Sequence, residues 1–122
     1  MFAFRRNHYD RLVHFAFGLA IAWPVRELVL RWTRAPRGVV CLLAFAVIVA
    51  LAALYELGEW IVALTFAPER ADRYLGQQGD PWDAQHDMAL AAVGAAFSML
   101  VAALAWVPAR DAARAQDGAT SE

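Results

Sequence analysis

The sequence has few of the residues on which cross-linked folds and nucleophilic enzymes depend. Cys41 is the only cysteine, so no disulfide can form within the chain, and a packed thiol in an apolar run is the simplest interpretation. The two serines, Ser98 and Ser121, lie within an apolar run and near the carboxyl end. No Gly-x-Ser-x-Gly, His-Glu-x-x-His or phosphate-loop motif occurs. These absences argue against serine-nucleophile chemistry.

Charge is also scarce. Only 19% of the 122 residues are charged, the net charge is −1, and 61% are hydrophobic. That balance gives no basis for binding nucleic acid, and it is too apolar for an ordinary soluble domain. No small-x-small cleavage site follows the first apolar stretch, so we interpret that stretch as a membrane helix and not as a secretory signal.

Three apolar stretches predict an all-α integral membrane bundle in an up-down-up arrangement. The clearest is 39–54, which contains no charge. The predicted transmembrane helices are 10–33, where Pro24 is expected to cause a kink, 38–66 and 81–107. A polar flank (1–9), a polar connector (67–80) and a tail expected to be disordered (108–122) complete the chain.

Acidic and imidazole side chains recur at one end of each predicted span. Because alternate helices run in opposite directions, all of them should reach the same leaflet. Their spacing of three or four residues places each pair on one helix face, and small residues such as Gly18 and Gly94 continue those faces. The spacing therefore predicts one shared buried polar site, made of Asp10, His14, Glu56, Glu59, Asp83 and Asp87.

Several carboxylates around one imidazole cannot all stay ionised in a low-dielectric setting unless they bind cations, share protons or pair with Arg. An oxygen-rich site with one His suits Mg²⁺, Mn²⁺ or Ca²⁺, and Zn²⁺ is also tolerated. We therefore predict these six residues as ligands of a divalent metal. Asp87, Glu59 and His14 are the predicted catalytic residues.

Simpler interpretations stay open for most of these residues. Asp80 and Asp83 suit the start of a helix, where Asp80 caps free N–H groups and Pro81 fits the first helical position. Asp10 can pair with a neighbouring Arg, and His14 can be an ordinary packed histidine. Glu56 and Glu59 can lie at the headgroup level if their helix tilts. Asp87, a full turn inside its helix, fits these alternatives least well.

Four ordered motifs carry a family resemblance. They are Asn7–Phe15 (NHYDRLVHF), Pro24–Glu27 (PVRE), Tyr55–Trp60 (YELGEW) and Gln78–Met88 (QGDPWDAQHDM). Together they resemble the YjdF-like bacterial inner-membrane proteins, a family of unknown function, and there is a more remote likeness to VanZ-like membrane proteins. Members of the first family carry further membrane helices before this region, so the resemblance implies a short or truncated version. His86 stands where the family typically has Lys, so no essential ligand role is expected for it.

The sequence thus predicts a multi-pass protein of the bacterial inner membrane. The leading functional hypothesis is a metal-dependent hydrolase or transferase acting on a lipid or envelope phosphate. The alternatives are a proton- or cation-coupled transport module and a structural membrane subunit. The expected partners are the lipid bilayer and either further copies of the chain or another membrane subunit, and no nucleic acid is expected.

Overall fold

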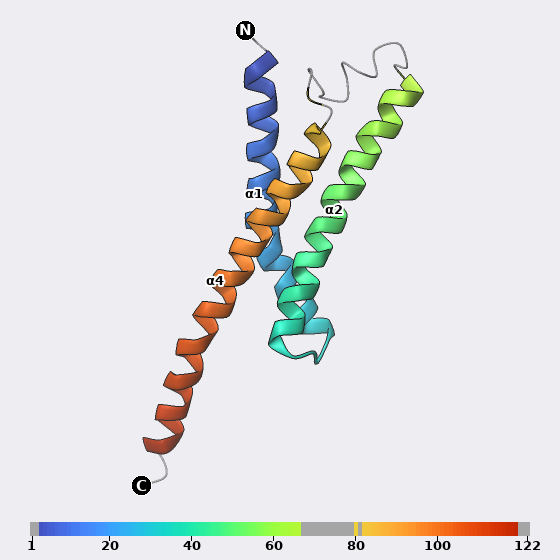
Figure 1. Ribbon diagram of the computed structural model, residues 1–122. Coiled ribbons are helices and arrows are strands. Elements are labelled where there is room, and N and C mark those ends of the chain that lie inside the picture. Colours follow the sequence, from blue (N-terminus) through green and yellow to red (C-terminus); the bar gives the residue numbers. More distant parts are fainter. Residues whose placement is uncertain (1–2, 67–79, 81, 120–122) are drawn as a thin grey trace.

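Three long helices make up the computed structural model, which describes residues 3–66, 80 and 82–119 (Figure 1). They are α1 (Ala3–Trp32), α2 (Arg37–Phe66) and α4 (Asp83–Ala119). No strand occurs in the part of the chain that the structure describes. The predicted all-α class is confirmed.

Each helix contains a segment long and apolar enough to cross a membrane. These segments are His8–Trp32, Arg37–Thr65 and Asp83–Ala105, of 25, 29 and 23 residues. At 1.5 Å per residue each exceeds the ~30 Å hydrocarbon core of a bilayer. The predicted three-span membrane bundle is therefore confirmed. The amino end of α1, the carboxyl end of α2 and the start of α4 all lie at one end of the bundle (Figure 1).

The helices pack through small side chains. α4 packs more extensively against α1 than against α2. Ala22, Ala44, Ala95 and Ala102 form a buried cluster with Ile48 and Met99. Small residues let helix backbones approach closely in lipid, where van der Waals contact replaces the hydrophobic effect as the main attraction. Cys41 is a free thiol that packs, partly buried, against this cluster.

The closest approach is between α1 and α4, at Gly18 and Gly94. A Cβ atom built on Gly18 would overlap the carbonyl oxygen of Ala91 and lie 2.9 Å from the amide nitrogen of Ala95. One built on Gly94 would overlap the carbonyl oxygen of Phe15. The two backbones are thus in direct contact. This crossing fixes the height of the α1 side chains relative to those of α4.

The structure differs from the expected boundaries most at the start of α1 and at the end of α4. α1 begins at Ala3, inside the expected polar flank, and it continues through Pro24. α4 continues through Pro108 to Ala119, over most of the segment for which a disordered tail was expected. The residues after Pro108 are rich in Ala and Arg, which favour helix strongly enough to extend it. The connector residues 67–79 and Pro81, the predicted first helical residue, lie outside the described residues.

Arg26 and Glu27 lie inside the first span, near its far end. They form an ion pair, and the Arg26 guanidinium lies 5.3 Å from the centre of the Trp23 ring. Arg26 is buried. The ion pair and the aromatic ring together stabilise a charge that would be costly in lipid.

Candidate functional site

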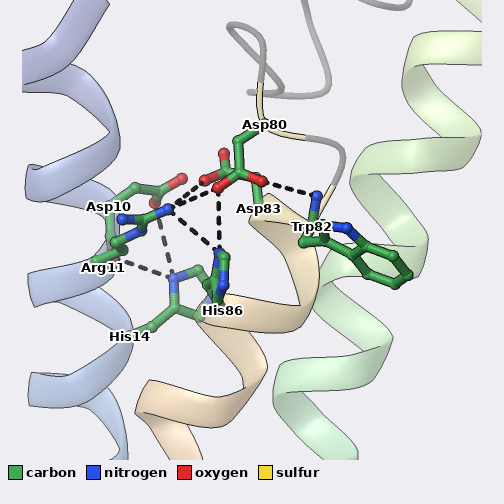
Figure 2. Close-up of polar contacts among 7 residues, drawn as sticks. All are labelled: Asp10, Arg11, His14, Asp80, Trp82, Asp83 and His86. Carbon is green, nitrogen blue, oxygen red and sulfur yellow. Dashed lines mark hydrogen bonds and ion pairs between the residues drawn. The ribbon is translucent and has the colours of Figure 1, made fainter.

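The start of α4 is capped by Asp80. The backbone N–H of Trp82 donates to Oδ1 of Asp80 across 3.0 Å, as expected for a helix N-cap (Figure 2). Oδ2 of Asp80 forms an ion pair with Arg11 of α1 at 3.0 Å and lies 3.1 Å from Nδ1 of His86. Asp80 therefore also connects α4 to α1. These contacts explain the presence of an Asp at this position without a role in metal binding.

Asp80 lies just outside the third span, and its surroundings favour the ionised form. The hydrogen bond from the backbone N–H of Trp82 holds the pKa of the Asp80 carboxyl below its usual value, and the nearby side chains of His86 and Arg11 act in the same direction. Asp80 is therefore an anion at neutral pH and remains a partner for Arg11.

His14 is the point where side chains from α1 and α2 meet. It is buried, with 6% of its surface exposed. Its Nε2 lies 3.1 Å from Oε1 of Glu56, and its Nδ1 lies 3.2 Å from the Asp10 carbonyl oxygen and 3.8 Å from the Asp10 carboxylate. The Glu56 contact has ion-pair distance but not hydrogen-bond alignment, because Oε1 has no hydrogen-bond partner among the described residues. The rings of Tyr55 and His14 pack in a T-shaped arrangement, with centroids 5.6 Å apart.

Asp87 of α4 lies against this imidazole and is 2% exposed. Ligand atoms of Asp10, His14 and Asp87 all lie within 4.8 Å of one another. Oδ1 of Asp87 is buried, and no described residue forms a hydrogen bond with it. Two carboxylates and one imidazole, from two helices, thus converge on one point.

The other three predicted ligands are not members of this three-residue group. Asp83 is buried at the first turn of α4, where its Oδ1 lies 3.5 Å from the Arg11 guanidinium (Figure 2). Glu56 contacts the far side of His14. Glu59 is partly buried on α2, one turn beyond Glu56. Their roles as ligands, and the catalytic roles of Asp87, Glu59 and His14, stay predictions.

Two residues at this end of the bundle were not among the predicted site residues. Arg11 pairs with Asp80 and Asp83, whereas the sequence offered only Asp10 as a partner for a neighbouring Arg. The Tyr55 ring packs against His14. A usable signal was present for Arg11, since it is the basic residue between Asp10 and His14 at the height of the acidic groups.

Comparison with known proteins extends these observations. A family model described as "Predicted membrane protein (DUF2238)" matches residues 1–107. The inner membrane protein YjdF of Escherichia coli is 43% identical over 97 residues, which is 78% of this chain and 46% of the relative. The chain thus spans about half the length of the curated relative it matches. No solved structure matches.

The expected YjdF-like membership is confirmed by the family match and by this identity. The remote likeness to VanZ-like proteins stays a prediction. Three spanning helices and an inner-membrane relative also confirm the expected multi-pass location in the inner membrane. The chain belongs to the DUF2238 family of membrane proteins.

Proposed function

We propose that the protein holds a divalent cation between Asp10, His14 and Asp87 and uses it to hydrolyse or transfer a phosphate group of a lipid or another envelope compound. The donor set supports a cation that accepts mainly oxygen ligands, such as Mg²⁺ or Mn²⁺, with Ca²⁺ and Zn²⁺ as alternatives. Three protein ligands leave coordination positions open for water and substrate, which is typical of catalytic metal sites.

The observation that carries this proposal is the buried Oδ1 of Asp87. A carboxylate oxygen removed from water without a hydrogen bond costs several kcal/mol, and buried oxygens of this kind are rare. Asp87 is 2% exposed, and Oδ1 has no hydrogen-bond partner among the described residues. A cation at the point where Asp10, His14 and Asp87 converge would supply the missing partner and offset the two negative charges.

Glu56 fits the role of a residue that orients the imidazole. Metal-binding histidines commonly present one ring nitrogen to the metal and donate the other N–H to a carboxylate. Oε1 of Glu56 lies 3.1 Å from Nε2, and Nδ1 contacts the Asp10 carbonyl oxygen. Binding of a cation at Nδ1 would replace that carbonyl contact and align the Nε2–H with Glu56. We therefore assign Glu56 to positioning His14 and not to the first coordination sphere.

When bound, the cation would make a water molecule more acidic. The water oxygen would form a bond to phosphorus as the bond between phosphorus and the ester oxygen breaks. Glu59 would accept the proton from water and pass it to the leaving oxygen, which departs as an alcohol. In a transferase, a second alcohol replaces water in the same step.

Metal binding tests the proposal directly. Wild-type protein in detergent should bind one Mn²⁺ per chain, measured by electron paramagnetic resonance and elemental analysis. Asp87→Asn should weaken binding at least about a hundredfold, ~2.7 kcal/mol. Asp83→Asn is the matched control, because it alters a buried Asp one turn away that faces Arg11, and it should change affinity less than about fivefold. Absence of stoichiometric metal in the wild type, or equal affinity in Asp87→Asn and wild type, refutes the site.

A second candidate function is proton- or cation-coupled transport. It is favoured by the contact of His14 with Glu56 on one side and Asp10 on the other, which joins titratable groups of two helices. Two results together would support transport. The wild-type protein would bind no metal, and it would carry protons into proteoliposomes at a rate that Glu56→Gln abolishes.

The expected homo-oligomer or partner subunit stays a prediction, which the mass of the purified complex tests.

A further inference from the structure

A cavity of about 350 Å³ opens between α1 and α2 beside the three-residue group. Its volume lies in the range of small-molecule sites, ~300–1,000 Å³. It is lined by Asp10, Val13, His14 and Phe17 of α1 and by Leu51, Ala52 and Tyr55 of α2. We call it the α1–α2 groove.

The α1–α2 groove changes in polarity along its length. Asp10 and His14 lie at the end nearest the membrane face, and Phe17 lies deeper along α1, about 10 Å from Asp10 and about 4.5 Å from His14. Because α2 runs in the opposite direction, Tyr55 lies beside the polar end, where its ring contacts His14, and Leu51 lies deeper. The groove therefore runs from a charged mouth into the apolar interior of the bilayer.

This polarity determines what can fill the groove. Its deeper walls are Phe17, Leu51 and Ala52, which offer water no side-chain hydrogen bonds, and water is not retained in such places. An acyl chain can pack against these apolar walls, because it has no hydrogen-bonding group that would be left unsatisfied. At the mouth, a cation held by Asp10, His14 and Asp87 would attract a phosphate.

We infer that the α1–α2 groove holds one acyl chain of a phosphate-bearing lipid, whose phosphate lies at the Asp10–His14 end. The substrate class of the site is then a lipid phosphate and not a water-soluble envelope phosphate. This inference rests on the proposed function for the phosphate end only, because the apolar part of the groove exists whether or not a cation is bound.

Exposed residues that line the groove allow it to be blocked without disturbing the buried core. Val13 is 44% exposed and lines the groove, whereas its neighbour Leu12 is 61% exposed and does not. On α2, Leu51 is 43% exposed and lines it, whereas Leu54 is 62% exposed and does not. Trp at Val13 or Leu51 would fill the groove. Trp at Leu12 or Leu54 adds the same indole to a lipid-facing surface.

The test is a titration of detergent-solubilised protein with dioleoylphosphatidic acid, followed by native mass spectrometry, in Mn²⁺ and in EDTA. Val13→Trp and Leu51→Trp should each weaken lipid binding about tenfold, whereas Leu12→Trp and Leu54→Trp should stay within about twofold of wild type. Dioleoylglycerol, which has the same chains without phosphate, should bind wild type more weakly in Mn²⁺.

The outcomes separate the two proposals. If groove and control variants bind phosphatidic acid equally, the groove proposal is refuted, even when Mn²⁺ binds to all of them. A different result would be that wild type binds phosphatidic acid in EDTA, the groove variants do not, and wild type binds no Mn²⁺. That result supports the groove proposal and refutes the metal-dependent function. Equal binding of dioleoylglycerol and phosphatidic acid in Mn²⁺ refutes the placement of the phosphate.

Discussion

Replacing Gly94 by Ala should separate α1 from α4. The added Cβ would overlap the carbonyl oxygen of Phe15 and lie 2.8 Å from the amide nitrogen of Leu19. Both atoms belong to the α1 backbone, which cannot rotate away as a side chain can. The Phe15 oxygen is the nearer of the two atoms, so restoring a normal contact of ~3.5 Å requires the helices to move apart by roughly 1 Å or more.

The magnitude follows from two opposing effects. Overpacking costs ~1–3 kcal/mol, and a clash with backbone belongs at the upper end of that range. Ala is favoured over Gly in a helix by ~1 kcal/mol. The net loss in the free energy of unfolding should therefore be about 2 kcal/mol for Gly94→Ala. Gly58→Ala is the matched control, because no atom of the described residues, apart from its own stretch of helix, lies within 4 Å of its added Cβ, and it should be neutral or stabilising.

The assay is unfolding of the purified protein in mixed micelles of increasing SDS content, followed by circular dichroism. Gly18→Ala should resemble Gly94→Ala, and the double variant should lose less than the sum, because one separation of the helices relieves both overlaps. Equal unfolding midpoints for Gly94→Ala and Gly58→Ala would show that α1 and α4 do not cross in backbone contact.

Two further predictions concern the α4 cap and the core. Since the pKa of Asp80 is lowered in the folded protein, its contribution to stability is present above the unfolded pKa and is lost as the pH falls through the lower folded value. Unfolding measured between pH 6 and about pH 2 should show this loss in wild type and not in Asp80→Asn, and identical profiles would contradict it. Ile48 is fully buried, so Ile48→Ala should cost ~1–3 kcal/mol in the same SDS assay. Val47→Ala, at a 38% exposed position, should stay within ~0.5 kcal/mol, and a similar loss in both would refute the core assignment.

The spans could be predicted from the sequence because each depends on a long apolar run, which is a local property. The shared height of the polar residues could also be predicted, since α1 and α4 run opposite to α2. The pairing of Arg11 could not be predicted in the same way. Asp83 and Asp87 are one turn apart on one helix face, yet one faces Arg11 and the other lies against His14.

The different partners of Asp83 and Asp87 depend on the rotation of α4 about its own axis and on the Gly18–Gly94 crossing, which are tertiary properties. A helical periodicity gives the face of a helix but not the angle at which that face meets its neighbour. The extension of α4 past Pro108 is a different case. There the choice between helix and disorder depends on a small difference in free energy, which composition alone does not resolve.

The position of His14 has a consequence for how the protein is made. The ribosome completes α1 before α2 and α4, which carry the carboxylates of Glu56 and Asp87. Until α4 emerges, the imidazole in α1 lacks these polar contacts, and a polar group alone in hydrocarbon is costly. Release of α1 into lipid should therefore wait, beside the insertion machinery, until α4 arrives.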